Sequence, residues 1–400
     1  MPKLLMINVC ANWGSTGRIA EQIGVLAQKN GWDVYMAFGG SHNPSQLKTI
    51  KIGNKALRFL HYILYRFFDR EGMGSIIATW LFSRKIKKIK PDVVHLHNIH
   101  GHYLNYTILF KALKEMRVPV VWTLHDNWPI TGHCYLYRKN DCNKWKTECD
   151  NCIKNGRYAF DNSKANFIRK KEAFTSLDCI TLITVSRWLA GVVKESFLKK
   201  YPLKTIYNGI DLNVFRPHNT DEIRKRFQLF GQTIILGVAS TWTEGKGYSD
   251  YISLSRLLPD DYKIVMIGLT KKQITKLPNN ILGIERTQNV AELVEWYSIA
   301  DVVLSLSYGE SMGLTPIEGM ACGTPAVVYD NTAQPELVTS ETGIIVETGN
   351  VGAVRDAIIK LCSMPKSDYI EKCTKRASVF EKEKQFHEYI SEYEYILSKC

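Results

Sequence analysis

Two glutamates, Glu310 and Glu318, are separated by seven residues within the stretch SYGESMGLTPIEGMACGTP (residues 307–325). A strand is predicted at 301–306, and the helix that follows, beginning at 313–316, has Glu318 in its first turn. Free N–H groups at a helix start can hold a phosphate, and a carboxylate there can accept two hydrogen bonds from a ribose. A capping box of Thr315 and Glu318, with Pro316 opening the helix, is the alternative. It leaves Glu310 unexplained, because no helix begins there.

A glycine-containing turn, NWGSTGR at residues 12–18, lies between the first predicted strand and a helix. Gly14 and Gly17 would let backbone N–H groups approach a phosphate at the helix N-terminus. The turn departs from G-x-G-x-x-G, and no acidic residue is suitably placed after the second strand, so a nicotinamide-type dinucleotide is disfavoured. A plain turn without a ligand is the open alternative.

Four of the ten cysteines, Cys134, Cys142, Cys149 and Cys152, fall in a single loop rich in Lys, Asn, Asp and Trp. The C-x2-C pair at its end can hold a tetrahedral ion, and the other two thiols would complete a structural zinc site that braces the loop. Free reduced thiols and disulfides are the alternatives. The chain has no signal-peptide pattern and no apolar run long enough to span a bilayer, so a reducing cytoplasm with few disulfides is expected.

Short apolar runs alternate with helical patterns along the whole chain. Several runs, such as Ile234-Ile235-Leu236, are apolar throughout, as expected of parallel strands covered on both faces. This alternation predicts an α/β fold with parallel sheets. Strands are predicted at 3–9, 33–38, 92–98, 118–125 and 179–185 in the first half, and at 205–207, 233–239, 263–267, 281–284, 301–306, 325–329 and 343–346 in the second.

The series of strands restarts after the turn signal Asn208-Gly209, which predicts two domains. We expect Rossmann-like, doubly wound domains at 1–205 and 206–380 that face one another across a cleft, with ligands outside the carboxyl ends of the strands. The segment 381–400 is predicted to be a helix that packs back on the N-terminal domain. Its apolar stripe consists of Phe386, Tyr389, Ile390, Tyr393 and Ile396.

The net charge of +13 is distributed unevenly. Residues 1–200 carry 31 Lys and Arg against 14 Asp and Glu, a net charge of +17, whereas residues 201–400 carry −4. Basic runs at 84–90 and 169–171, and aromatic and arginine residues interleaved at 58–70, suit an anionic membrane surface. An ordinary solvated helix face is the alternative. No motif of a nucleic-acid-binding domain supports a nucleic-acid partner.

Further phrases lie in a characteristic order around the glutamates. They are VSRW with Ser186 and Arg187, NGID at 208–211, KG with Lys246, ELVEWY at 292–297 and GMACGTPAV at 319–327. With Glu310 and Glu318 as an E-x7-E motif, the chain resembles the retaining GT-B glycosyltransferases of the family-4 type. The phrases HLHNIHG at 95–101 and TLHDNWPITGHC at 123–134 are similar to those of bacterial capsule, exopolysaccharide and colanic-acid assembly enzymes.

The resemblance implies that the C-terminal domain binds a nucleotide-diphosphate sugar. The catalytic residues would be Glu310, His125 and Lys246, with Lys246 neutralising the diphosphate, Glu310 orienting the sugar and His125 approaching it. Acceptor-side residues would be His97, Asn98, Ser186 and Arg187. Residues that bind the donor would be Glu318, Gly313, Leu314, Met312, Thr315, Gly14 and Gly17.

The implied reaction moves the sugar to a glycan or lipid-diphosphate-linked acceptor at the inner face of the plasma membrane, with retention of configuration. No D-x-D motif occurs, so no cofactor is expected for catalysis. One departure from the family is Thr241, where an arginine usually assists the lysine. A nucleotide-sugar 2-epimerase of the same fold and a non-catalytic sugar-nucleotide-binding regulator are the alternatives. His95, His97, His100 and His102 also allow a metal site, and His125 a purely structural role.

Overall fold

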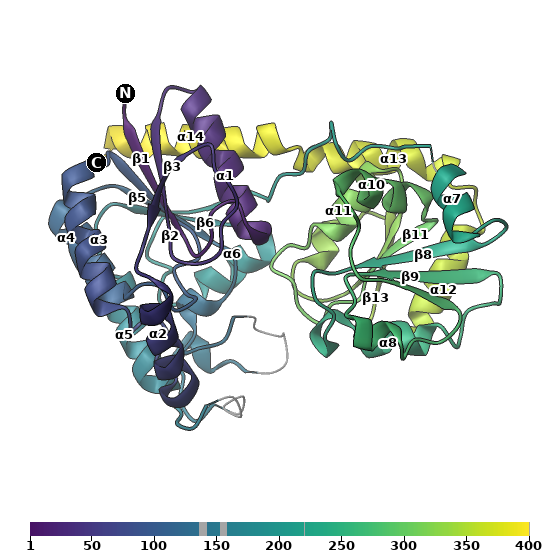
Figure 1. Cartoon of the computed structure of the whole chain (residues 1–400), viewed down its shortest axis with the longest axis horizontal. Helices are drawn as coiled ribbons and strands as arrows, with labels where there is room; N and C mark the ends of the chain where they lie inside the picture. The colour runs from purple at the N-terminus through teal and green to yellow at the C-terminus, as the bar shows by residue number, and fades with distance from the viewer. Residues whose placement is uncertain (136–141, 153–157, 220, 400) are drawn as a thin grey trace. The chain divides into compact units, whose positions relative to one another are not determined.

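The computed structural model describes residues 1–135, 142–152, 158–219 and 221–399, and the chain divides into two compact units (Figure 1). Unit 1 comprises Met1–Tyr207 and the chain from Gln385 on, and unit 2 comprises Asn208–Lys384. Each unit contains one entirely parallel sheet with helices beside it, so the expected pair of Rossmann-like domains is confirmed.

Unit 1 has a seven-stranded sheet in the order β3-β2-β1-β4-β5-β6-β7. Two strands differ from expectation: β3 was not predicted, and β7 ends two residues earlier than the predicted strand 205–207 and pairs with β6 in unit 1. The strands are β1 (Lys3–Asn8), β2 (Asp33–Phe38), β3 (Lys48–Lys51), β4 (Val93–Leu96), β5 (Val120–Leu124), β6 (Ile180–Thr184) and β7 (Leu203–Thr205).

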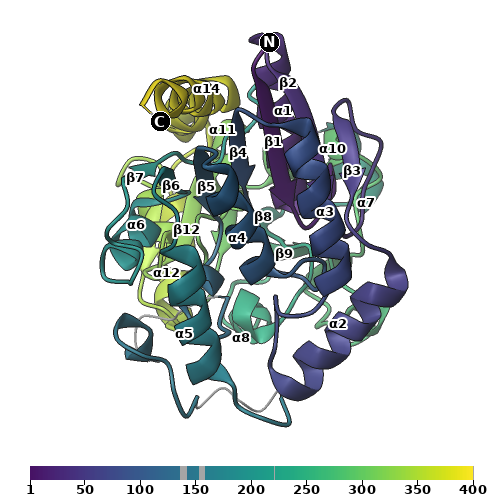
Figure 2. The same ribbon diagram turned by 90° about the vertical axis from the view of Figure 1, so that its left-hand side faces the viewer.

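Helices cover both faces of this sheet because successive strand residues point to opposite sides. On β5, Val121 lies in one core with residues of α1 and α14, whereas the ring of Trp122 contacts Phe110 of α4 and Phe174 of α5. Figure 2 shows α3, α4 and α5 along this second side. The helices are α1 (Gly14–Lys29), α2 (Lys55–Phe68), α3 (Ile76–Ile89), α4 (Tyr106–Met116), α5 (Ser163–Phe174), α6 (Arg187–Lys194) and α14 (Lys382–Lys399).

The apolar stripe of α14 is buried in the core of unit 1 together with residues of β1, β2 and α1. Two tyrosines of the stripe also form polar contacts with the sheet. Tyr393 Oη lies 2.6 Å from Nδ1 of His95, and Thr123 Oγ1 donates to Tyr389 Oη over 3.3 Å. Helix α14 therefore supplies part of the core of unit 1.

Unit 2 has a six-stranded sheet in the order β10-β9-β8-β11-β12-β13. Its strands are β8 (Thr233–Val238), β9 (Tyr262–Ile267), β10 (Ile281–Ile284), β11 (Val302–Ser305), β12 (Ala326–Tyr329) and β13 (Gly343–Val346). Its helices are α7 (Asp221–Phe227), α8 (Tyr248–Leu254), α9 (Lys271–Ile274), α10 (Val290–Ile299), α11 (Thr315–Ala321), α12 (Val351–Cys362) and α13 (Ser367–Ala377).

The direction of winding changes between β1 and β4 in unit 1 and between β8 and β11 in unit 2. At such a point the loops after two neighbouring strands run in opposite directions and leave room for a ligand. In the described ranges, none of the helices is both long and apolar enough to cross a membrane.

Candidate active site

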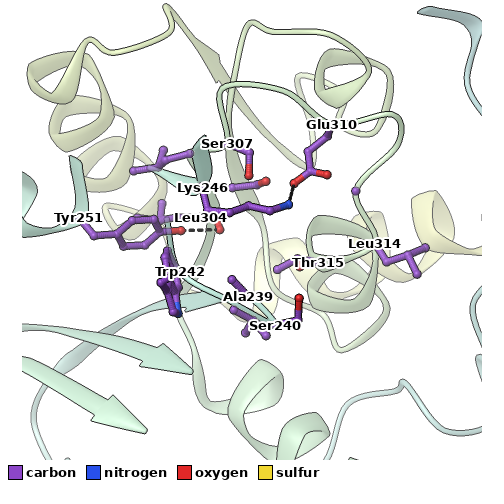
Figure 3. Close-up of a pocket in the computed structure, with 14 residues that line it drawn as sticks. Ala239, Ser240, Trp242, Lys246, Tyr251, Leu304, Ser307, Glu310, Leu314 and Thr315 are labelled. Atoms are coloured by element: carbon purple, nitrogen blue, oxygen red, sulfur yellow. Dashed lines mark hydrogen bonds and ion pairs between the residues drawn. The ribbon is translucent and has the colours of Figure 1, made fainter. Parts of the chain in front are cut away.

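A cavity of about 160 Å³ lies in unit 2 at the carboxyl ends of β8 and β11 (Figure 3). Its walls come from the loop after β8, the loop after β11 and the start of α11. Lys246, Glu310, Gly313, Leu314 and Thr315, all predicted from the sequence, line it. This position is where doubly wound sheets bind their ligands.

Lys246 reaches the cavity because the chain makes a tight turn behind it. Gly247 has a φ of +74°, and a Cβ atom at this position would lie 2.3 Å from the carbonyl oxygen of Leu306. The N–H of Tyr308 donates to the carbonyl of Gly245 over 2.9 Å, which ties the lysine loop to the loop after β11. A glycine is therefore required for the close approach of these two loops.

Glu310 forms an ion pair with Lys246, in which Nζ contacts Oε1. Its side chain is 17% exposed, so this carboxylate is largely withdrawn from solvent. The backbone N–H of Glu310 donates to Oγ1 of Thr332 over 2.8 Å, and its carbonyl accepts from the N–H of Ala333. Lys246 and Glu310 are thus held by separate loops and meet at the cavity.

The loop after β12 supports Glu310, and the sequence did not predict this contribution. Besides Thr332, Nδ2 of Asn331 donates to the carbonyl of Tyr308 over 2.6 Å, and Nε2 of Gln334 donates to the carbonyl of Ser307 over 2.7 Å. The available signal was a segment rich in polar residues, DNTAQ, directly after the predicted strand 325–329.

Glu318 accepts a hydrogen bond of 2.6 Å from the hydroxyl of Tyr297 on α10. Burial and the adjacent Glu318 carboxylate raise the pKa of Tyr297 well above its usual value. Thr315 is the first residue of α11, and the residue before it, Leu314, makes no side-chain cap. The capping-box alternative is therefore wrong. Among the described residues, the cavity lining includes Thr315 but not Glu318.

Met312 faces the interior of unit 2, with its sulfur 3.0 Å from the backbone nitrogen of Asn208. Its side chain is buried, so only its backbone can serve a ligand. Gly313 has a φ of +83°, and a Cβ there would lie 3.5 Å from Cγ of Glu310. The glycine therefore turns the chain directly beside the glutamate.

Gly14 and Gly17 belong to unit 1 and have different structural roles. Gly14 begins α1 with a φ of +65° and has open space around its Cα, and α1 has no side-chain cap. Gly17 is buried, and a Cβ there would lie 3.2 Å from the carbonyl oxygen of Cys10. The second glycine thus allows α1 to pack closely on the loop after β1.

His97 and His125 lie directly after β4 and β5 and form a buried pair. Nδ1 of His97 lies 3.1 Å from Nε2 of His125, and the rings stack with centroids 5.4 Å apart. Burial lowers the pKa of His125 to about 4 and that of His97 well below its usual value, so both are neutral at pH 7. Asn98 follows, and its backbone N–H donates to Oδ1 of Asn8.

Ser186 and Arg187 lie at the start of α6. The hydroxyl of Ser186 accepts from the N–H of Leu189 over 3.2 Å, so this buried serine is the N-cap of the helix. Arg187 is exposed in the first turn. Ser186 and Arg187 are neighbours in the chain, and the structure gives Ser186 a structural role as the cap of α6.

The cysteine loop differs from the predicted four-thiolate arrangement. Cys134 and Cys152 come together with His133, which the sequence had not singled out, whereas Cys142 and Cys149 are not part of that group of close ligand atoms. Cys179 is disulfide-bonded, whereas few disulfides were expected.

Two family models together match nearly the whole chain. "Glycosyltransferase Family 4" matches residues 17–214, and "Glycosyl transferases group 1" matches residues 219–379.

Two curated relatives are similar to this chain over part of its length. N-acetyl-alpha-D-glucosaminyl L-malate synthase of Bacillus anthracis is 27% identical over 68% of this chain and 65% of its own length. WcaC of Escherichia coli K12, a candidate colanic acid biosynthesis glycosyl transferase, is 26% identical over 52% of this chain and 55% of its own. The chain thus spans between half and two thirds of the length of these curated relatives.

The Anabaena protein HepE in complex with UDP-glucose has the same fold, with a TM-score of 0.69, 14% sequence identity and complete coverage of both chains. The two family models match one part of the chain each, residues 17–214 and 219–379, which correspond closely to units 1 and 2. The chain belongs to the GT-B glycosyltransferases, with a family-4-type part followed by a group 1 part.

Proposed function

We propose that this protein transfers a sugar from a nucleoside-diphosphate sugar to a glycan or lipid-diphosphate-linked acceptor, with retention of anomeric configuration, in the assembly of a bacterial surface polysaccharide. The observation that carries the proposal is the meeting of Lys246 and Glu310 in a cavity at the carboxyl ends of β8 and β11. An ammonium and a carboxylate at this place match the two halves of such a donor, the phosphates and the sugar hydroxyls.

The chemistry requires stabilisation of the leaving group. When the bond between the anomeric carbon and the diphosphate breaks, negative charge develops on the phosphate oxygens while the sugar becomes oxocarbenium-like. A positioned ammonium stabilises that charge. On donor binding, Lys246 would exchange the Glu310 carboxylate for phosphate oxygens, and Glu310 would accept hydrogen bonds from the sugar hydroxyls. Glu310 thus orients the sugar, and we do not assign it as a nucleophile.

The nucleoside is assigned to Glu318. A ribose diol donates two hydrogen bonds, which a carboxylate accepts well. Tyr297 contacts one oxygen of this carboxylate and fixes its orientation. Because the tyrosine lies on α10 and the glutamate on α11, the packing of these two helices holds the proposed ribose site.

The acceptor is assigned to unit 1, where His97 and Asn98 follow β4 and where Ser186 and Arg187 follow β6. The neutral imidazoles of His97 and His125 can exchange hydrogen bonds with hydroxyl groups, although they carry no charge to attract phosphate. Arg187 is the group in this set that would meet a phosphorylated acceptor.

The exposed apolar side chains of α2 and α3 support a membrane-bound acceptor. Only His61 of α2 is buried. The α2–α3 surface has apolar side chains that are 42–64% exposed: Phe59, Leu60, Tyr62, Phe67, Phe68, Ile76, Ile77, Trp80 and Leu81. Exposed cations beside them include Lys55, Arg66, Arg84, Lys85 and Lys88. Apolar and basic groups together suit an anionic bilayer surface.

The names of the relatives indicate which compounds to test first. HepE was crystallised with UDP-glucose, and WcaC is associated by name with colanic acid. A UDP-sugar is therefore the first donor to test, followed by GDP- and ADP-sugars. The chain should be stabilised against heat by its own donor, because a ligand that binds the folded state raises its stability.

The deciding experiment is product analysis with that donor and a lipid-diphosphate-linked glycan. The proposal expects an extended glycan whose new linkage has the same anomeric configuration as the donor, seen by NMR coupling constants. An inverted product contradicts retention. Epimerised donor without transfer identifies an epimerase, and donor binding without any turnover identifies a regulator; either result contradicts the proposed transfer.

A further inference from the structure

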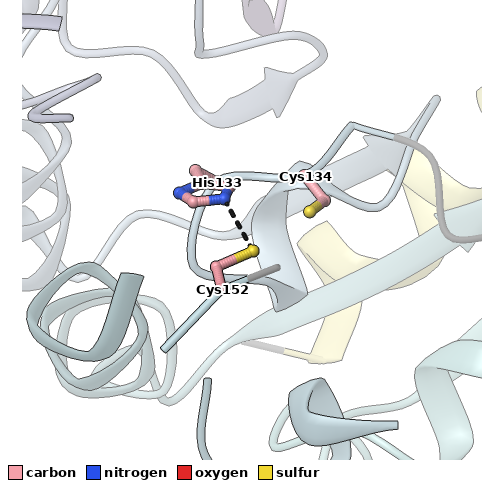
Figure 4. Close-up of side chains that lie close together, drawn as sticks. All are labelled: His133, Cys134 and Cys152. Carbon is pink, nitrogen blue, oxygen red and sulfur yellow. Dashed lines mark hydrogen bonds between the residues drawn. The ribbon is translucent and has the colours of Figure 1, made fainter. Parts of the chain in front are cut away.

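Three potential metal ligands converge in the loop that follows η1 (Trp128–Ile130) in unit 1 (Figure 4). Nε2 of His133 lies 3.1 Å from Sγ of Cys152, and one ring nitrogen of His133 and the sulfurs of Cys134 and Cys152 all lie within 4.8 Å of one another. Ligands at ~2.0–2.3 Å from a tetrahedral zinc ion are themselves roughly 3.5–4 Å apart. The three donors are therefore close to the spacing that one such ion requires.

A buried carboxylate holds the histidine in the orientation that a metal ligand needs. Nδ1 of His133 lies 2.8 Å from Oδ2 of Asp69, which is fully buried at the C-cap of α2. The same oxygen accepts from the N–H of Asn162 over 3.2 Å. Histidines that bind metal usually donate their second ring N–H to a carboxylate in this way, which points the other nitrogen at the ion.

Cys149 can supply the fourth ligand. Its Sγ accepts a hydrogen bond from the N–H of Gly132, the residue before His133, over 3.3 Å. It also forms the C-x2-C pair with Cys152. The thiol of Cys142, like that of Cys149, lies outside the close group, and the carbonyl of Cys142 accepts from the indole of Trp145.

A second set of donors, Asp69, His133 and Asp161, is also close together. Asp161 is already engaged, because one of its oxygens accepts from the N–H of Cys152 and the other from the N–H of Ser163 at the start of α5. The carboxylates therefore support the thiol site from outside, and they do not form a separate site.

The composition of the loop indicates why it would need an ion. Within the described residues 142–152, only Trp145 is buried, and most neighbours are exposed polar or charged residues. Such a segment has too little apolar surface to order itself, and a metal bound by its side chains can contribute the missing free energy.

We propose that this loop binds one structural zinc ion through Cys134, Cys149, Cys152 and Nε2 of His133, with Asp69 positioning the histidine. The ion connects the loop to the C-terminus of α2, because Asp69 contacts the ligand His133. It also connects the loop to the segment before α5, because Asp161 accepts from the N–H of the ligand Cys152. It takes no part in sugar transfer, so this inference stands independently of the proposed function.

The test is the metal content of the full chain purified without chelator, measured by elemental mass spectrometry. We expect about one zinc per chain, and a loss of most of it in Cys152→Ser and His133→Ala. Cys362→Ser removes a half-buried thiol from α12 in unit 2 and is expected to retain the zinc. In the cobalt-substituted protein, thiolate-to-metal charge-transfer absorption should appear and then decrease in Cys134→Ser.

A measurement on the unaltered chain guards against variants that fail to fold. A chelator should remove the zinc and lower the melting temperature, and added zinc, but not magnesium, should restore it. The proposal is overturned if the chain is purified without zinc and added zinc does not change its melting temperature. If Cys142→Ser loses the ion while His133→Ala retains it, the ligands are the four cysteines and the assignment of His133 is wrong.

Discussion

Lys246 and Glu310 stand 64 residues apart in the sequence and form an ion pair at the carboxyl edge of the sheet of unit 2. The lysine follows β8 and the glutamate follows β11, two strands that are neighbours in the sheet but not in the chain. Parallel pairing brings the ends of both strands to one edge, so the fold itself creates this pair of charges.

Replacing Gly247 with alanine should displace Lys246. A Cβ would lie 2.3 Å from the carbonyl oxygen of Leu306, and the φ of +74° adds strain of about 1–2 kcal/mol for a residue other than glycine. We expect a loss of more than about 2 kcal/mol in unfolding free energy, together with weaker donor binding.

The matched control for this change is Gly231→Ala. Gly231 has a φ of +71° but no atom within 4 Å of the added Cβ, so this variant isolates the strain. Urea unfolding and donor titration of both variants provide the comparison. Equal effects of the two substitutions would show that the contact with Leu306 is unimportant.

Tyr297→Phe should weaken donor binding because it removes the hydroxyl that orients Glu318. We expect Kd for the donor to rise roughly tenfold, which corresponds to about 1.4 kcal/mol, a typical cost for a hydrogen bond to a charged group. Isothermal titration measures this change.

Tyr201→Phe is the control for the loss of a tyrosine hydroxyl. Tyr201 donates to the carbonyl of Leu177 within unit 1, over 3.0 Å, and has no proposed role with the donor. Its Kd should stay at the unaltered value. If Tyr297→Phe also retains that value, the ribose assignment to Glu318 loses its support.

The stability of unit 1 should decrease as the pH falls below 6.5, and His61 should account for part of this decrease. Its Nε2 accepts from the N–H groups of Gly72 and Gly74. Burial, followed by the proximity of His102, lowers the pKa of His61 to about 3. Between pH 6.5 and about 3 the unfolded chain binds the proton more readily, so unfolding becomes easier by up to about 1.4 kcal/mol per pH unit.

His61→Gln preserves an acceptor near the position of Nε2 and removes the titration. Its unfolding free energy should vary less steeply between pH 6.5 and 4.5 than that of the unaltered chain. Identical slopes for the two proteins would refute this role for His61.

The α2–α3 surface should bind anionic lipid. In a flotation assay, we expect the chain to bind vesicles that contain phosphatidylglycerol more than vesicles of pure phosphatidylcholine. High salt should weaken this binding because salt screens the basic residues. The double variant Phe59→Ser with Trp80→Ser should bind several-fold more weakly, since two exposed apolar groups are lost.

Phe230→Ser serves as the control for the lipid experiment, because Phe230 is 61% exposed but lies in unit 2. It should float as the unaltered chain does. Equal loss in both proteins, or flotation that does not depend on lipid charge, would exclude the α2–α3 surface as the attachment site.

The sequence predicted most of the framework because buried parallel strands leave a clear signal. Runs such as that of β8 are apolar at nearly every position, since helices cover both faces. β3 has no such signal: three of its four residues are exposed. Its pairing with β2 depends on contacts that no local pattern encodes.

The candidate site also contains some residues whose position the sequence predicted and others whose position it did not. Glu310, Gly313 and Lys246 lie in recognisable phrases at strand ends, so their place at the cavity could be predicted. Thr332, which fixes the backbone of Glu310, lies in a loop after a different strand and has no characteristic phrase of its own. Its contribution follows only from the order of strands in the sheet.

The structural roles of Lys170 and His133 could not be predicted either, because they depend on how these side chains are buried. Lys170, part of a basic run in the sequence, is buried, donates to the carbonyls of Trp128 and Thr131, and is therefore no part of a basic surface. His133 is proposed as a ligand because Asp69, far away in the sequence, contacts it. Both outcomes depend on long-range packing.

The most direct test of the account is the rate of nucleoside diphosphate release from the donor by Lys246→Ala. Removal of one positioned group that stabilises developing negative charge typically lowers kcat about 10²–10³-fold, and that loss is predicted here. Lys276→Ala, which removes an exposed lysine elsewhere in unit 2, should release the nucleotide at the unaltered rate. If Lys246→Ala also retains the full rate, the cavity at the ends of β8 and β11 is not the site of the reaction, and the account is contradicted.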